Sequence, residues 1–100
     1  MERFLSKFKG KLLVLGSENC PSCTEFKERV KRSEAAEEFS FVDVEKSEEA
    51  KGVAEALDLR SFPTVLRVED AGGKLVVCVL GKTYEPEQCY EVEVEGDERS

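Results

Sequence analysis

The chain has no histidine and no tryptophan among its 100 residues. Without histidine it has no Ser-His or Cys-His dyad and no imidazole to ligate a metal. Its only strongly nucleophilic side chains are four thiols, at Cys20, Cys23, Cys78 and Cys89. Any covalent chemistry is therefore expected to pass through sulfur.

Basic charge is also scarce, because 15 lysines and arginines face 22 aspartates and glutamates, which gives a net charge of −7. A nucleic-acid binder needs a basic surface for phosphate contacts, so we expect no nucleic-acid partner. The longest apolar runs, residues 12–15 and 75–80, are far shorter than the about 20 residues that cross a bilayer, so we expect no membrane partner.

The amino-terminal residues carry charges and no long apolar run, which is unlike a signal peptide, so we expect a cytoplasmic protein. In a reducing cytosol, paired cysteines are more often catalytic or metal-binding than structural. Glutamate and lysine are abundant, whereas Asn19 and Gln88 are the only side-chain amides. This bias is typical of thermophile proteins, some of which keep intracellular disulfides.

Apolar periodicity predicts one α/β domain over residues 1–100. We expect a short helix over residues 2–9, strands over 12–15, 39–44, 64–69 and 75–80, and helices over 20–33 and from Glu48, capped by Ser47. Strands separated by a helix are parallel, whereas the last two strands flank a glycine-bearing turn and form an antiparallel hairpin. The prediction is a mixed four-stranded central sheet, in the order β-α-β-α-β-β, with flanking helices.

The domain divides into an amino-terminal helix (1–10), a core (11–81) and a carboxyl-terminal extension (82–100). In the extension, Pro86 lies where a helix would begin. Residues 90–95 instead alternate apolar side chains with glutamates, which is the period of a strand. A helix and a strand are both consistent with residues 83–95, and we favour the strand. Residues 96–100 are expected to fray.

The motif Cys20-Pro21-Ser22-Cys23 lies between the first strand and the second helix. If Cys20 is the N-cap, Cys23 shares a helix face with Phe26 and Val30. That face must meet the sheet, so we expect Cys23 to be shielded and Cys20 to lie at the exposed helix tip. The unsatisfied N–H groups of the helix end favour an anion, and a thiolate at Cys20 is such an anion.

Such a pair is suited to thiol–disulfide exchange. Cys20 would attack a substrate disulfide to form a mixed disulfide, and Cys23 would then attack Cys20 and release the reduced substrate. The alternative is a metal-binding or non-catalytic interaction module, in which the two cysteines hold zinc or an iron–sulfur cluster, with ligands from a second chain. Cys78 and Cys89 do not form a second motif of that kind, so we expect no metal.

Two stretches carry a resemblance to a known family. Residues 12–23 (LLVLGSENCPSC) resemble the first central strand and active-site loop of the thioredoxin/glutaredoxin superfamily. Residues 56–66 (ALDLRSFPTVL) are similar to the stretch that carries the cis-proline of this superfamily. The resemblance covers residues 4 to about 81 and implies a thioredoxin-like fold. It further implies that a cis peptide precedes Pro63, which faces the cysteine pair.

The resemblance also implies a function. It indicates a thiol–disulfide oxidoreductase of cell redox homeostasis that works without a cofactor, as a monomer, on protein disulfides. A disulfide reductase is one candidate electron donor. The Cys20–Cys23 pair would be catalytic, and Pro21, Ser22 and Pro63 would contact substrate. Phe62 is either a further substrate contact or a core residue.

The sequence departs from both branches of the superfamily. Asn19 stands where thioredoxins carry tryptophan, and Pro21-Ser22 replaces their Gly-Pro, which is closer to glutaredoxins. Val14 stands where thioredoxins carry a buried acid, so proton transfer to the second cysteine needs another route. Ser17 and residues 81–83 replace positions at which glutaredoxins bind glutathione, which argues against glutathione as a ligand.

The other two cysteines lie in an apolar strand (Cys78) and in the polar tail (Cys89). A disulfide between them would tie the tail to the sheet and add about 2–4 kcal/mol, provided that the tail returns beside the fourth strand. Otherwise Cys78 is a small buried apolar residue, and Cys89 pairs between chains or serves as a third redox thiol. The sequence leaves these interpretations open.

Overall fold

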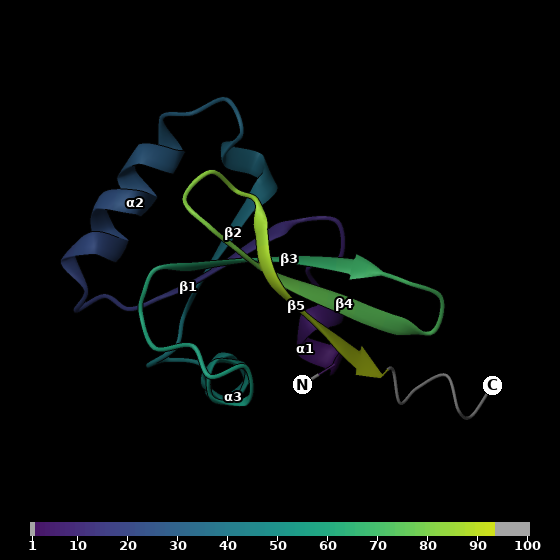
Figure 1. Cartoon of the computed structure of the whole chain (residues 1–100). Helices are drawn as coiled ribbons and strands as arrows, with labels where there is room; N and C mark the ends of the chain where they lie inside the picture. Colours follow the sequence, from purple (N-terminus) through teal and green to yellow (C-terminus); the bar gives the residue numbers. More distant parts are fainter. Residues whose placement is uncertain (1, 94–100) are drawn as a thin grey trace.

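The computed structural model describes residues 2–93 of the chain, and Figure 1 labels its helices and strands. In chain order they are α1 (Glu2–Ser6), β1 (Leu12–Gly16), α2 (Pro21–Lys31), the 3-10 helix η1 (Ala36–Glu38), β2 (Phe39–Asp43), α3 (Glu48–Ala56), β3 (Thr64–Asp70), β4 (Lys74–Leu80) and β5 (Pro86–Glu93). None of the helices within residues 2–93 is long and apolar enough to cross a membrane.

The strands form one mixed, five-stranded sheet in the order β2-β1-β3-β4-β5. β1 pairs with β2 in parallel, and the pairs β1–β3, β3–β4 and β4–β5 are antiparallel. The predicted α/β fold with its β-α-β-α-β-β core is confirmed. The carboxyl-terminal extension adds a fifth strand, as the alternating pattern favoured. The expectations for residues 94–100 lie outside the described part of the chain.

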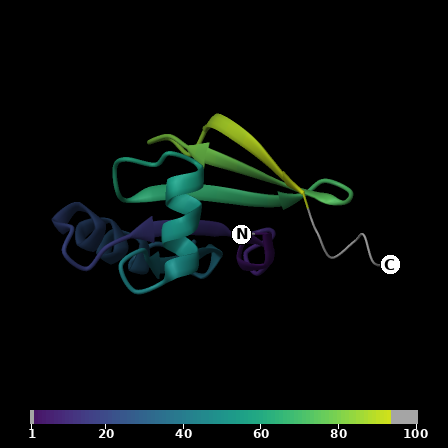
Figure 2. The ribbon, with the colours of Figure 1, turned by 90° about the horizontal axis from the view of Figure 1, so that it is seen from below.

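β1 is an interior strand of the sheet, with β2 on one side and β3 on the other. Leu13, Val14 and Leu15 are at most 2% exposed. Burial on both faces is the reason that this apolar run is continuous rather than alternating. In Figure 1, α2 lies on one side of the sheet and α1 and α3 lie on the other. Figure 2 shows the same chain from below, with α3 crossing the strands.

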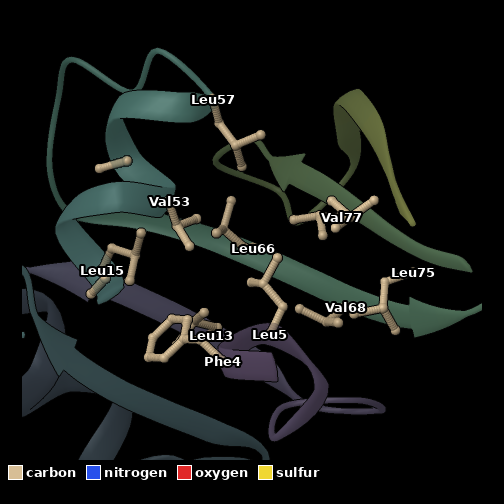
Figure 3. Close-up of a cluster of buried hydrophobic side chains, with 13 residues drawn as sticks. Phe4, Leu5, Leu13, Leu15, Val53, Leu57, Leu66, Val68, Leu75 and Val77 are labelled. Atoms are coloured by element: carbon tan, nitrogen blue, oxygen red, sulfur yellow. The ribbon is translucent and has the colours of Figure 1, made fainter. Parts of the chain in front are cut away.

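The larger part of the core lies between the sheet and the helices α1 and α3 (Figure 3). α3 follows its N-cap Ser47, whose hydroxyl oxygen accepts the Ala50 N–H at 3.1 Å. The apolar stripe predicted for this helix is confirmed, because Ala50, Val53 and Ala54 are buried in the cluster. On the sheet, Leu66 of β3 is fully buried against them.

The smaller part of the core lies on the opposite face of the sheet, beneath α2. It consists of Val14, Val65 and Leu80, with Leu12, Phe26, Phe39, Phe41 and Cys78 packed against them. α2 covers the β2–β1 side of this face, whereas the exposed Arg67 of β3 marks the side that the helix does not reach. The two faces of the sheet are therefore covered unequally.

The first helix is shorter than the sequence predicts, because α1 ends at Ser6 rather than at residue 9. Lys9 forms a bridge with Val68, and the Gly10 N–H donates to the Val68 carbonyl at 2.9 Å. The chain thus leaves the helix early to pair with β3, and Gly10, at φ +76°, allows the turn. η1 has no signal in the sequence, because Ala36–Glu38 carries no apolar periodicity.

Candidate active site

Cys20 lies at the junction of β1 and α2. It is the N-cap of α2, with an extended backbone (φ −104°, ψ 110°). Its Sγ accepts the backbone N–H of Cys23 at 3.2 Å, which satisfies one of the unpaired donors at the helix end. Pro21 follows as the first helical residue, where a missing N–H leaves no hydrogen bond unmade. The predicted N-cap position of Cys20 is confirmed.

Cys23 is the shielded member of the pair, with 9% of its surface exposed. It lies on the buried face of α2 together with Val30, as the helical spacing predicts. Both cysteines of the motif are free thiols in this structure. Burial raises the pKa of Cys23 to about 11, and the neighbouring Cys20 side chain adds to the rise. Cys23 is therefore a protonated thiol at neutral pH.

Pro63 reaches the cysteine pair from a distant part of the chain. The Phe62–Pro63 peptide bond is cis. The Cys20 thiol donates to the Phe62 carbonyl at 3.7 Å, across 42 residues of sequence. β1 and β3 are antiparallel neighbours with Leu15 opposite Thr64, so the end of β1 lies beside the start of β3. The structure thus brings the two sequence motifs together in one site.

One comparison with known proteins gives a match. A family model of the thioredoxin-like domain matches residues 1–92. The chain belongs to the thioredoxin-like family. No curated protein and no solved structure matches the chain.

Beside Phe62, the thioredoxin-like domain has a groove of about 570 Å³. Its lining combines apolar and charged side chains, namely Val44, Ala54, Leu59 and Phe62 with Glu45, Lys51, Glu55 and Asp58. Phe62 is half-buried. One part of its side chain packs against the main core cluster, and another part lines the groove. Pro21 and Ser22 are exposed at the start of α2 and do not line this groove.

A second cavity, of about 360 Å³, borders Cys23 between α2 and the strands β1 and β2. Asp43, at the carboxyl end of β2, lines it as well. The carboxylate of Asp43 accepts the N–H of Glu18 at 3.2 Å and the N–H of Glu45 at 2.8 Å. Its charge adds to the rise in the pKa of Cys23, after burial and the contribution of Cys20.

Sequence reasoning missed two residues of this thioredoxin-like site, Asp43 and Gly16. The register places them opposite each other on the parallel strands β1 and β2. The carboxyl ends of parallel strands meet at one edge of a sheet. This rule could have placed Asp43, at the end of β2, beside the end of β1 and the cysteine motif. A Cβ on Gly16 would lie 3.0 Å from the Sγ of Cys23, so glycine leaves room there for the buried sulfur.

We expect Gly16→Ala to destabilise the reduced protein by about 1–3 kcal/mol, because the added methyl group overpacks Cys23. Urea unfolding followed by circular dichroism measures the loss. Gly52→Ala is the matched control, because a Cβ there meets nothing within 4 Å and alanine is preferred in a helix such as α3. Equal stability of the two variants would contradict the close approach at Gly16.

The second cysteine pair lies outside this site. Cys78 of β4 and Cys89 of β5 are directly opposite in register, with their Cα atoms 4.0 Å apart. Their sulfurs form a disulfide. The carboxyl-terminal extension pairs with β4 as strand β5, and this pairing brings the two cysteines close enough for the disulfide. Cys78 is half-buried and Cys89 is exposed.

Proposed function

We propose that this thioredoxin-like chain is a thiol–disulfide oxidoreductase that exchanges its Cys20–Cys23 dithiol with protein disulfides. One observation supports the proposal above all. The Cys20 sulfur lies at the N-terminus of α2, 3.2 Å from the Cys23 nitrogen and 3.7 Å from the Phe62 carbonyl oxygen. A nucleophilic sulfur, a resolving thiol and the backbone beside cis-Pro63 therefore meet at one place.

In the first step, the Cys20 thiolate attacks one sulfur of the substrate disulfide and displaces the other sulfur as a thiolate. The product is a mixed disulfide between Cys20 and the substrate. Two features stabilise the negative sulfur before the attack, namely the positive end of the α2 dipole and the hydrogen bond from the Cys23 N–H. No imidazole base is needed for this step.

In the second step, Cys23 loses its proton and attacks the Cys20 sulfur. The reduced substrate leaves as a thiolate, and the pair becomes a disulfide. In the free protein, burial and the Cys20 side chain both hold the pKa of Cys23 high. The mixed disulfide removes the charge and the thiol hydrogen bond of Cys20, so Cys23 loses its proton more readily after the first step than before it. This order gives Cys23 the role of resolving thiol.

The cavity beside Cys23 provides a path for the proton. Its volume of about 360 Å³ is large enough for water. Asp43 is the carboxylate of β2 that lines this cavity, and we assign it as the proton acceptor through water. Asp43 would thereby replace the acid that is missing at Val14.

The groove beside Phe62 would hold the substrate segment, with Pro63 and the exposed Pro21 and Ser22 facing the disulfide under attack. We infer that one domain over residues 1–100 acts as a cytoplasmic monomer without a cofactor. A disulfide reductase or another dithiol donor would return the pair to its reduced form.

Reduction of insulin tests the proposal. With dithiothreitol as the electron source, the chain is expected to accelerate insulin precipitation, measured as turbidity, above the rate with dithiothreitol alone. Absence of acceleration would contradict the proposal. So would stoichiometric zinc or iron in protein purified under reducing conditions, because that result indicates the metal-binding alternative. Within residues 2–93 no three Cys, Asp or Glu side chains gather as a metal site, so such a metal would need further ligands.

A further inference from the structure

The outermost strand β5 has few contacts besides its ladder with β4. Only Val92 is buried and Tyr90 half-buried among its residues, and the others are exposed. The Tyr90 hydroxyl donates to the Leu57 carbonyl at 3.3 Å, and Lys74 pairs with Glu91 at 3.2 Å across the two strands. Apart from the peptide chain that connects β4 to β5, the Cys78–Cys89 disulfide is the covalent link between β5 and the rest of the described sheet.

The disulfide runs from Cys78, at the border of the cluster beneath α2, to the exposed Cys89 on the outermost strand. Leu12, Arg67, Cys78 and Cys89 are successive partners in register, so their side chains share one face of the sheet. Leu12 packs in the cluster under α2, whereas Arg67 is exposed. Solvent therefore reaches the disulfide, most of all at Cys89.

A basic residue, Arg67, stands opposite Cys78 on the neighbouring strand. Arg67 is the direct cross-strand neighbour of Cys78, which places the two Cβ atoms about 4.5–5.5 Å apart. Its guanidinium also lies 3.7 Å from Glu69, an exposed pairing that leaves other donors free. A guanidinium beside a sulfur stabilises the thiolate that leaves when a disulfide is attacked.

The two cysteine pairs are too far apart to exchange within one molecule. Cys23 lies against Gly16 at the end of β1, whereas Cys78 is in register, through Arg67, with Leu12 at its start. Four residues along a strand and two strands across correspond to about 13 Å and about 10 Å, which is about 16 Å in all. Exchange requires contact between sulfurs, so the second pair must react with an external thiol.

We propose that Cys78–Cys89 is a second redox site, which dithiols open independently of Cys20 and Cys23 and whose reduction releases β5 from β4. A thiolate of the dithiol attacks the exposed Cys89 sulfur, and Cys78 leaves as a thiolate beside Arg67. The second thiol of the reductant then attacks the mixed disulfide and frees Cys89. The dithiol is oxidised to its disulfide, and the two cysteines take up two electrons and two protons.

Accessibility of the pair is tested by alkylation of the native protein. Trypsin yields residues 12–27 with the first pair, 75–82 with Cys78 and 83–99 with Cys89, so mass spectrometry distinguishes the sites. We expect dithiothreitol followed by N-ethylmaleimide to label Cys78 and Cys89 together without denaturant, and equally in the Cys20→Ser/Cys23→Ser variant. Labelling that appears only after guanidinium unfolding would overturn the proposal.

Release of β5 is tested by amide hydrogen exchange on the same double variant, in its oxidised and reduced forms. Reduction is expected to speed exchange in β5 by about 10- to 100-fold, because opening the strand no longer works against the tether. The Cys78→Ser/Cys89→Ser variant is the control, and its β5 exchange should not respond to dithiothreitol. Unchanged exchange on reduction would overturn the proposal. Neither test uses Cys20 or Cys23, so failure here is distinguishable from failure of the oxidoreductase assay.

Discussion

Cys20→Ser is expected to reduce catalysed insulin reduction to the rate of dithiothreitol alone. A serine hydroxyl at the α2 N-cap can still accept the Cys23 N–H, so the helix should keep its cap. It cannot form a disulfide with substrate, and Cys23 is buried with a pKa of about 11, so it cannot take over the attack. Turbidity measures the rate, and circular dichroism verifies that the variant is folded.

Cys23→Ser is the companion variant that separates the two chemical steps. It keeps the nucleophile and removes the resolving thiol, so the mixed disulfide on Cys20 should accumulate. Intact mass spectrometry after incubation with a disulfide-containing peptide should show one added peptide chain, which dithiothreitol removes. If Cys20→Ser stayed as active as the wild type, the assignment of the nucleophile would be wrong.

The second large effect concerns the reactivity of the Cys23 thiol. A rise of its pKa from 9.0 to about 11 lowers its thiolate fraction at pH 8 about 100-fold relative to an ordinary cysteine. Iodoacetamide should therefore label Cys23 of the reduced protein about 10- to 100-fold more slowly than a cysteine in an unfolded peptide, because the higher nucleophilicity of a high-pKa thiolate offsets part of the loss. The rate should rise about tenfold per pH unit up to about pH 11, because only the thiolate reacts.

The same measurement on Cys20→Ser tests the physical cause. Burial is the largest cause of the raised pKa, and the hydrogen bond and charge of Cys20 are further causes. Removing the Cys20 sulfur should leave Cys23 less reactive than a free cysteine, but more reactive than in the wild type. Fragment spectra of the peptide covering residues 12–27 locate the label. Identical Cys23 rates in both proteins would exclude a contribution from Cys20.

The positions of Cys20 and Cys23 in the candidate site were predictable from the sequence because they are set by local rules. A cysteine directly before Pro21 is an N-cap by helix geometry, and helical periodicity alone places Cys23 on the buried face. β1 was predicted in the same way, since four consecutive apolar residues after Lys11 fit a strand buried on both faces. The approach of Pro63 to Cys20 came from family resemblance, because no local pattern encodes a contact across 42 residues.

The features that the sequence did not predict depend on tertiary contacts. Asp43 looks like an ordinary strand-end residue until β2 is known to lie parallel to β1. The need for glycine at position 16 is visible only in the folded structure, where the Cys23 sulfur packs against its backbone. The early end of α1 follows from the pairing of Lys9 with Val68, which overrides helical periodicity. In each case the interacting residue is distant in sequence, so the local pattern of apolar and polar residues cannot predict the contact.

The strand order of the sheet has a consequence for how the chain folds. β3, β4 and β5 are joined by short turns, whereas β1 must close a long loop to reach β3, and contacts of high sequence separation form against a larger entropy. The contact between Cys20 and Phe62 exists only after β1 has paired with β3, while Cys78 and Cys89 need nothing beyond the β4–β5 hairpin. The geometry around Cys20 is thus completed only after the long-range β1–β3 pairing, whereas Cys78 and Cys89 come together within a local hairpin.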